Sequence, residues 1–250
     1  MSKFSVTVSA LLVATLSTIS SSAESALVQG QPLPKYPEVG ERVASGLPAV
    51  DKQPSLEDFV RLSERNEGYG GGRGEVCTVA PLPPALAINS RNAFVSDRPI
   101  FIWQGAANQI EVRQVADRKL IWEKDLKPQE SVATYPTSGQ ALLPNQEYEL
   151  RLLTSNEETR VRFKVASPDQ RQQIQAGLQA QVKQLSASQR TPAAIAVKQA
   201  IYLGEQKFWP DAFGNVFSVK QSEIPKSGQA AWNRGLSEIR SSVCGRKLKS

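Results

Sequence analysis

The side chains that most often supply catalytic or metal-binding chemistry, histidine and cysteine, are absent or rare in this chain. Its 250 residues include no histidine and two cysteines, Cys77 and Cys244. Without an imidazole, no serine or cysteine can be activated as a nucleophile by a histidine base. Zinc sites with imidazole ligands are also excluded, and two thiolates cannot complete an all-cysteine tetrahedral site. Carboxylate chemistry and a serine–lysine pair are what remain.

The carboxylates form two adjacent pairs, Glu57-Asp58 and Glu157-Glu158. A glycosidase holds two carboxyl groups about 5–10 Å apart across a cleft, which neighbours in sequence do not achieve. The first pair opens an expected short helix, where acidic groups interact favourably with the helix dipole. The second pair lies in an expected hairpin turn. We interpret both pairs as solvated, and we assign no catalytic, cofactor-binding or metal-binding residue.

Tryptophan offers the clearest hint of binding. Trp122, Trp209 and Trp232 would suit a platform that stacks on the apolar face of a sugar. The alternative is that all three fill core positions, as large aromatic side chains usually do. We assign a fourth tryptophan, Trp103, to the core.

The two cysteines favour one intramolecular disulfide between Cys77 and Cys244, because two cysteines in an exported chain most often pair. Such a bond would close a loop with 166 intervening residues. On chain-entropy grounds a loop of this length stabilises the fold by about 4–5 kcal/mol. Two free thiols or an intermolecular bond are the alternatives.

The first 23 residues have the pattern of a cleaved signal peptide. Lys3 gives a positive start, residues 4–19 are largely apolar, and small residues precede an expected cleavage after Ala23. A retained membrane anchor is the alternative, but a bilayer span needs about 20 predominantly apolar residues. No later segment is long and apolar enough to span a membrane. We therefore expect a periplasmic or extracellular protein.

Residues 24–76 are expected to be a proline- and glycine-rich leader and linker. Few large apolar residues accompany the prolines, so the segment cannot bury much surface. One short amphipathic helix is expected near residues 55–64, with Ser55 as its cap and Leu56, Phe59 and Val60 on one face. The glycine run at residues 68–74 lacks the Gly-Lys-Ser/Thr ending of a phosphate-binding loop. We interpret it as a flexible linker.

Residues 77–166 are expected to form an antiparallel β-sandwich of the fibronectin type III or immunoglobulin-like kind. Seven short strands separated by turns fit this region, near residues 85–88, 100–103, 110–112, 120–123, 132–135, 148–152 and 161–165. Leu142 to Tyr148 has the Leu-x-Pro-x-x-x-Tyr spacing of a tyrosine corner. Trp103 would lie on the second strand, where fibronectin type III domains commonly place a core tryptophan. Trp103 and Tyr148 are thus the expected structural core residues.

Residues 167–240 change to a helical period and predict a module of about four helices. Ser167-Pro168 and Thr191-Pro192 are helix-start signals, and further helices are expected from Trp209-Pro210 and around Trp232. The second and third helices resemble a degenerate tetratricopeptide hairpin. One hairpin is too short for a stable solenoid, so we expect a compact cap. Residues 241–250 are expected to be a basic tail that carries Cys244. The fold class is therefore α+β, with a sandwich followed by helices.

The positive charge of the chain is concentrated in its helical part. From residue 167 onward there are 12 Lys and Arg against 5 Asp and Glu, whereas residues 24–166 carry 17 against 19. A basic helical face would attract acidic glycan or anionic lipid, and export makes nucleic acid an improbable partner. The alternative is an ordinary solvated helix surface.

Several stretches together resemble a group of exported cyanobacterial proteins with no assigned activity. They are residues 70–77, 95–105, 143–149 and 208–211 together with the late Cys244. The resemblance covers about residues 70 to 245 of this chain. It implies export, a sandwich followed by helices, and pairing of the two cysteines. It supplies no catalytic or ligand-binding residues.

Taken together, these patterns favour a binding or scaffold protein of the cell envelope without catalytic activity. Its expected partner is an envelope protein or an acidic glycan, without a cofactor. An alternative is a carboxylate-dependent enzyme that acts on envelope polysaccharide. A third possibility is a structural role in which the leader tethers the domain to a larger assembly.

Overall fold

The computed structural model describes residues 55–66, 76–84, 86–87 and 92–245. All of them belong to one compact unit, Ala49–Ser250. The segment expected to be a signal peptide, most of the expected leader, the glycine run and the last five residues lie outside the described residues. The fold is mixed α+β, as expected from the sequence.

Eight strands form two sheets. The smaller sheet has the order β1-β3-β6 and is antiparallel; its strands are β1 (Cys77–Ala80), β3 (Ile100–Gln104) and β6 (Val132–Thr134). The larger sheet has the order β2-β8-β7-β4-β5; its strands are β2 (Ala93–Phe94), β4 (Gln109–Gln114), β5 (Leu120–Asp125), β7 (Glu147–Leu153) and β8 (Glu158–Val165). The short β2 runs parallel to β8, and the other pairs are antiparallel.

Six of the seven predicted strands are present, from β3 to β8. The first is not, because Leu86 and Ala87 lie in a turn, and Ala85 and Ile88 lie outside the described residues. Two strands that the sequence reading missed, β1 and β2, occupy the sheets instead. They have only four and two residues, so neither is long enough to show a clear alternation.

The two sheets pack face to face through alternate side chains. Phe101 of the smaller sheet meets Phe163 edge-on and stacks on Trp122 of the larger sheet, at centroid distances of 5.7 and 6.0 Å. Trp103 and Tyr148 are both buried. The Tyr148 hydroxyl accepts a hydrogen bond from the backbone N–H of Leu143 at 2.8 Å, as the tyrosine-corner spacing led us to expect.

Four helices follow the sheets, α2 (Pro168–Lys183), α3 (Pro192–Glu205), α4 (Trp209–Phe217) and α5 (Lys226–Cys244), with 3-10 turns at Ala187–Gln189 and Gln221–Glu223. The predicted starts are present. The Ser167 hydroxyl accepts the backbone N–H of Gln170, and the Thr191 hydroxyl accepts that of Ala194. Helix α5 continues beyond the expected end at residue 240 and carries Cys244, which bonds to Cys77 at an S–S distance of 2.20 Å.

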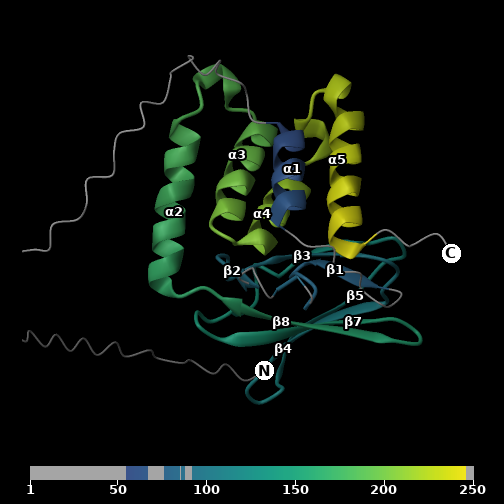
Figure 1. Ribbon diagram of the computed structural model, residues 1–250. Helices are drawn as coiled ribbons and strands as arrows, with labels where there is room; N and C mark the ends of the chain where they lie inside the picture. The colour runs from purple at the N-terminus through teal and green to yellow at the C-terminus, as the bar shows by residue number, and fades with distance from the viewer. Residues whose placement is uncertain (1–54, 67–75, 85, 88–91, 246–250) are drawn as a thin grey trace, which may run out of the picture. The chain divides into compact units, whose positions relative to one another are not determined.

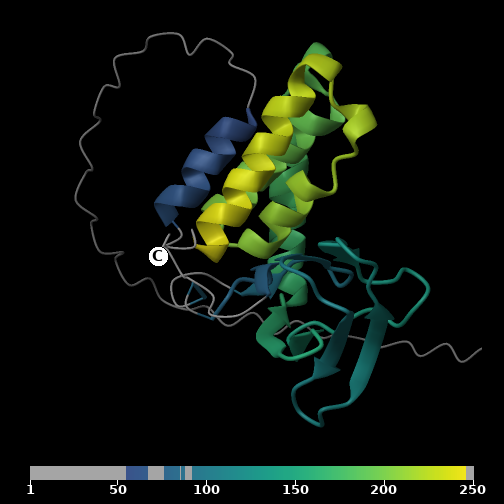
Figure 2. The same ribbon diagram turned by 90° about the vertical axis from the view of Figure 1, so that its right-hand side faces the viewer.

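The helices lie on the smaller sheet, on the side away from the larger sheet (Figure 1). Helices α4 and α5 both contact β1 and β3. Figure 2 shows the same layers from the side, with the helices above the sheets. One continuous hydrophobic core joins them, so the two sheets and the helices form a single packed body. None of the described helices combines the length and apolar character needed to span a bilayer.

The short helix predicted near residues 55–64 is α1 (Leu56–Asn66), and it belongs to this helical layer. It contacts α3 and α5. Phe59 is fully buried and lies 6.1 Å from the Trp209 ring and 5.9 Å from the Phe213 ring. The sequence reading placed this segment in a leader with little buried surface. Its apolar face is covered because complementary rings come from residues about 150 positions later in the chain.

Candidate anion-binding face

The candidate site lies on the face of the larger sheet that points away from the smaller sheet and from the helices. In β7 the side chains of Tyr148, Leu150 and Leu152 are buried, so the charged side chains between them point to the opposite face. In β8, Val161, Phe163 and Val165 are buried in the same way. We call the opposite surface the outer face; its charged residues are Glu111, Arg113, Glu123, Asp125, Glu147, Glu149, Arg151, Glu158, Arg160, Arg162 and Lys164.

Strand register places opposite charges beside each other across this face. Glu147 lies opposite Lys164, and Glu149 lies opposite Arg162. On the other side of β7, Glu111 of β4 lies opposite Arg151. Cross-strand pairs of opposite charge stabilise a sheet modestly. Two pairs break the pattern, because Arg151 lies opposite Arg160 and Glu111 lies opposite Glu123 of β5, so like charges meet at both places.

Glu111 is at the centre of the paired charges. Its Oε2 lies 2.8 Å from Arg113 Nε and 3.3 Å from Arg151 Nη1, and its side chain is only 9% exposed. The hydrogen bond from Arg113 and the charges of both arginines lower the pKa of Glu111, although partial burial acts in the opposite direction. This carboxylate therefore stays ionised and holds the two guanidinium groups in place.

Glu158 and Glu147 anchor the other paired cations. Glu158 forms ion pairs with Arg151 and Arg160. Burial raises the pKa of Glu158, but the hydrogen bond from Arg160 and the charge of Arg151 outweigh it and lower the pKa overall. Glu147 Oε1 lies 2.8 Å from Lys164 Nζ, and this hydrogen bond lowers its pKa. Glu111, Glu147 and Glu158 are thus ionised and already paired with cations.

Five arginines and one glutamate surround a hollow of about 300 Å³ on this face. Its lining residues, which define the arginine hollow, are Arg113, Gln114, Val115, Arg118, Glu149, Arg151, Arg160 and Arg162. Of these arginines, three are held by Glu111 or Glu158. Within the described residues, the guanidinium groups of Arg118 and Arg162 form no ion pair. They lie in an exposed turn and on an exposed strand position, where they can bind an anion.

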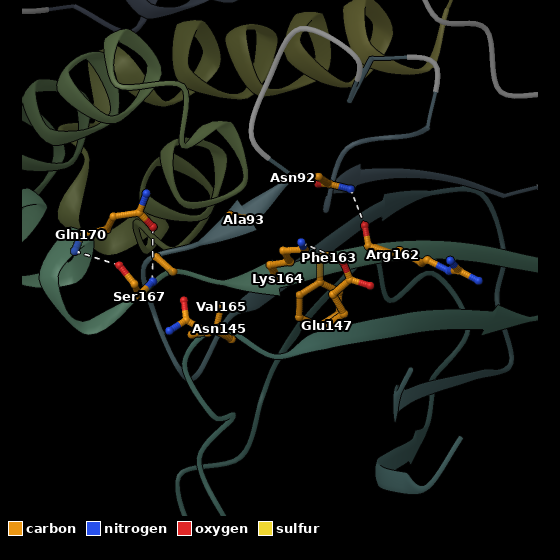
Figure 3. A pocket seen from close by; sticks show the side chains of 11 residues that line it. Asn92, Ala93, Asn145, Glu147, Arg162, Phe163, Lys164, Val165, Ser167 and Gln170 are labelled. Carbon is orange, nitrogen blue, oxygen red and sulfur yellow. Dashed lines mark hydrogen bonds and ion pairs between the residues drawn. The ribbon is translucent and has the colours of Figure 1, made fainter. Parts of the chain in front are cut away.

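A second hollow of about 500 Å³ adjoins the first and shares Arg162 with it. It lies between the ends of β2, β7 and β8 and the start of α2, and it is lined by amide, hydroxyl and carboxylate groups as well as backbone. We call it the amide hollow. In Figure 3, Asn145, Ser167 and Gln170 lie to one side of Phe163, and the guanidinium of Arg162 extends to the other. A third hollow, along the edge of β8, also includes Arg162.

The three tryptophans that the sequence suggested as a sugar-binding platform, Trp122, Trp209 and Trp232, are buried or partly buried. Trp209 is 1% exposed and Trp232 is 7% exposed, so neither ring can stack on a ligand. Trp122 is partly buried and packs on Tyr135 at 5.5 Å as well as on Phe101. The three rings therefore fill the interior and do not form an exposed platform.

Two basic residues of the helical part are engaged in contacts with other parts of the protein. Arg171 is paired with Asp97 at 2.9 Å. Arg240 packs 4.8 Å from the centroid of the Phe217 ring and donates to the Ser131 hydroxyl, and burial lowers its pKa. Three further cations, Arg246, Lys247 and Lys249, lie outside the described residues.

Two of the sequence stretches behind the family resemblance meet at one partly buried carboxylate. Asp211 of α4 accepts the backbone N–H of Val95 at 2.7 Å and that of Ser96 at 3.2 Å. Burial raises the pKa of Asp211 to about 7, although both N–H groups act in the opposite direction. Because both oxygens already accept backbone hydrogen bonds, this carboxyl group fastens the helical layer to the sheets.

The sequence patterns did not predict the outer face, because the strands were identified from the apolar residues of each alternation. The charged half was visible in Glu147-x-Glu149-x-Arg151 and in Arg160-x-Arg162-x-Lys164. Which charges meet depends on strand register, which cannot be read from one strand alone.

Among the described residues, no group of three His, Cys, Asp or Glu side chains is placed to hold a metal ion. Comparison of the chain with protein-family models, curated proteins and solved structures gives no significant match.

Proposed function

We propose that this chain is an exported, envelope-associated binding protein without catalytic activity, and that its outer face binds an anionic envelope component. The observation that carries this proposal is the arginine hollow, where five arginines surround one glutamate. Two of those arginines are free of ion pairs among the described residues. Guanidinium groups that are fixed by neighbours bind carboxylate, sulfate or phosphate with little further loss of entropy.

The state of the carboxylates favours binding over catalysis. A general acid needs a raised pKa and access to its substrate. The outer-face carboxylates that hold cations, Glu111, Glu147 and Glu158, have lowered pKa values. The carboxyl group with a raised pKa, Asp211, is partly buried between α4 and the sheets and accepts hydrogen bonds from two backbone N–H groups. This division argues against a carboxylate-dependent enzyme acting on envelope polysaccharide.

The sandwich that carries this face is, we propose, of the fibronectin type III kind. The order β1-β3-β6 beside β5-β4-β7-β8 supports this, because it follows strands A-B-E and C′-C-F-G of such sandwiches, with the two-residue β2 added in parallel at the β8 edge. The hydroxyl of Tyr148 on the next-to-last strand bonds back to Leu143, which supports the same assignment. Sandwiches of this kind serve many functions, so the binding proposal rests on the outer face and not on the fold.

Export to the periplasm or the cell exterior fits the cysteine pairing. The bond between Cys77 and Cys244 joins β1 to α5, and disulfides of this structural kind persist in oxidising compartments. The signal-like segment at residues 1–23 and the resemblance to exported cyanobacterial proteins support the same location. An acidic envelope polymer would be available to the outer face there.

Retention on an immobilised acidic polysaccharide, eluted with a salt gradient, tests the proposal. The double variant Arg118→Asn/Arg162→Gln removes the two free cations, and Asn tolerates the φ of 59° at position 118. The control Lys183→Gln/Arg234→Gln removes the same charge from exposed helix positions. We expect the outer-face variant to bind about tenfold more weakly and to elute at lower salt. Equal elution of both variants would show that net charge alone causes retention and would refute the proposal.

A further inference from the structure

The arginine hollow shares one lining residue with a surface of different chemistry, the amide hollow. The two are joined at Arg162, which lines both. A ligand longer than one chemical unit would therefore meet guanidinium groups at one position and amide and hydroxyl groups at the next. A matching ligand would carry an anionic group at one position and polar uncharged groups at the next.

The amide hollow presents both donors and acceptors. Among the residues that the structure describes, the side-chain amide of Asn145 has no hydrogen-bond partner, so both its oxygen and its nitrogen can bind a ligand. Gln170 uses its oxygen to accept the Ser167 N–H, which leaves its two amide hydrogens available. Ser167 accepts the Gln170 N–H and can still donate its own hydroxyl proton.

This mixture fits uncharged sugar hydroxyls better than further anionic groups. A hydroxyl both donates and accepts, whereas a phosphate, sulfate or carboxylate oxygen accepts only. Glu147 lines the amide hollow with a 44% exposed carboxylate, which would repel a second anion there. Lys164 already pairs with that carboxylate and so adds little free positive charge. A uniformly charged polymer would place a charge against Glu147.

We propose that the ligand of the outer face is a linear acidic glycan in which a charged sugar neighbours an uncharged one. The arginine hollow holds the carboxylate or sulfate, and the amide hollow holds the hydroxyl or acetamido groups of the neutral neighbour. This inference depends on the proposed function, because it names the class of anionic ligand that the outer face selects. Figure 3 shows the side chains that would flank the neutral sugar.

Three probes separate the ligand classes, measured by titration calorimetry at low salt. They are a hyaluronan octasaccharide, which alternates glucuronate with N-acetylglucosamine, an oligogalacturonate with the same number of carboxylates, and a short linear polyphosphate. We expect the wild-type chain to bind the alternating octasaccharide about five- to tenfold more tightly than the oligogalacturonate, because about one to two extra neutral hydrogen bonds form. Equal or tighter binding of either uniformly charged probe would overturn the inference.

Two substitutions assign the effect to the two hollows. Asn145→Gly removes the free amide and keeps the backbone φ of 61° that glycine adopts readily. We expect it to weaken binding of the octasaccharide about fivefold and to leave polyphosphate binding unchanged. If Asn145→Gly binds the octasaccharide as tightly as the wild-type chain does, the neutral-sugar assignment is wrong. The proposed function would not be affected by that result.

Arg162→Gln serves as the second test, with Arg234→Gln as its charge-matched control on α5. We expect Arg162→Gln to weaken the binding of all three probes, since every anion needs the shared guanidinium. If Arg162→Gln and Arg234→Gln change all three affinities equally, the proposed function itself fails. The two failures are thus distinguishable.

Discussion

Two carboxyl groups, one where the helices meet the sheets and one on the outer face, have pKa values shifted in opposite directions. At the contact between helices and sheets, Asp211 is partly buried, accepts two backbone N–H groups and has a pKa raised to about 7. On the outer face, Glu111 lies between two arginines and has a lowered pKa. Desolvation dominates in the first place and charge pairing in the second. The first carboxyl group fastens layers, and the second orients cations toward solvent.

This difference also explains where binding chemistry can be. The helices cover the side of the smaller sheet that faces away from the larger sheet. The smaller sheet is therefore enclosed on both faces. The larger sheet keeps one face in water, and that face carries the ordered charges. Substitutions at the covered contact should therefore change stability, whereas substitutions on the outer face should change stability little and binding strongly.

The largest effect is expected where the disulfide joins β1 to α5. Removing it with Cys77→Ser/Cys244→Ser releases a loop of 167 residues in the unfolded chain and should lower the free energy of unfolding by about 5 kcal/mol. Urea denaturation of the two proteins measures the loss, and thiol titration under denaturing conditions verifies that the parent has no free thiol. An unchanged unfolding midpoint would mean that the helical layer does not depend on this bond.

A slightly smaller loss is expected from Phe59→Ala in α1. Phe59 is fully buried against Trp209 and Phe213, so the substitution leaves a cavity and should cost about 4 kcal/mol. Leu143→Ala is the matched truncation, because Leu143 is 49% exposed and should cost well under about 1 kcal/mol. Thermal unfolding followed by circular dichroism compares them. Similar losses for the two variants would place α1 outside the core.

Asp211 should give an intermediate loss that depends on pH. Asp211→Ala leaves the buried N–H groups of Val95 and Ser96 without partners and should cost about 3 kcal/mol. Because burial raises the pKa from 3.8 to about 7, the folded state binds this proton more tightly than the unfolded chain does. The Asp211 contribution to the free energy of unfolding should therefore fall as pH rises from 3.8 to about 7.

Denaturation of wild type and Asp211→Asn across this pH range tests the sign. The variant cannot release the proton, so the difference in stability between the two proteins should change by at most about 1.4 kcal/mol per pH unit. The charged neighbours in this region, Arg171 and its partner Asp97, are the same in both proteins. Parallel pH profiles for the two proteins would contradict the buried-carboxyl account.

The smallest effect on stability is expected from Glu111→Gln on the outer face, about 1 kcal/mol, because the pair with Arg113 is partly exposed to solvent. Its pH dependence should have the opposite sign. The pKa of Glu111 is lowered from 4.5, so its contribution is present above pH 4.5 and is lost as pH falls through the folded-state pKa. Acid titrations of both proteins measure this difference. A loss that appears only above neutral pH would contradict the assignment.

Local patterns predicted much of the fold. Alternation identified the strands from β3 to β8, and Ser-Pro and Thr-Pro signals located the starts of α2 and α3. The sequence reading missed β1 and β2 because strands of four and two residues carry almost no periodic signal. It left α1 in the leader because the rings that cover Phe59 come from the far end of the chain.

Local sequence patterns predicted less of the candidate site. Tryptophan alone cannot distinguish a ligand platform from a core, and Trp209 and Trp232 are buried. The outer face depends on which charges lie opposite one another, and that is a property of register across three strands.

Amide chemical-shift mapping with the hyaluronan octasaccharide tests the central claim, that the outer face is the binding surface, most directly. Shift changes should gather at Arg118, Arg162 and the residues beside them in β7 and β8, and the amides of α5 around Arg234 should not move. Changes confined to the helices, with the amides of β7 and β8 unmoved at saturation, would contradict it.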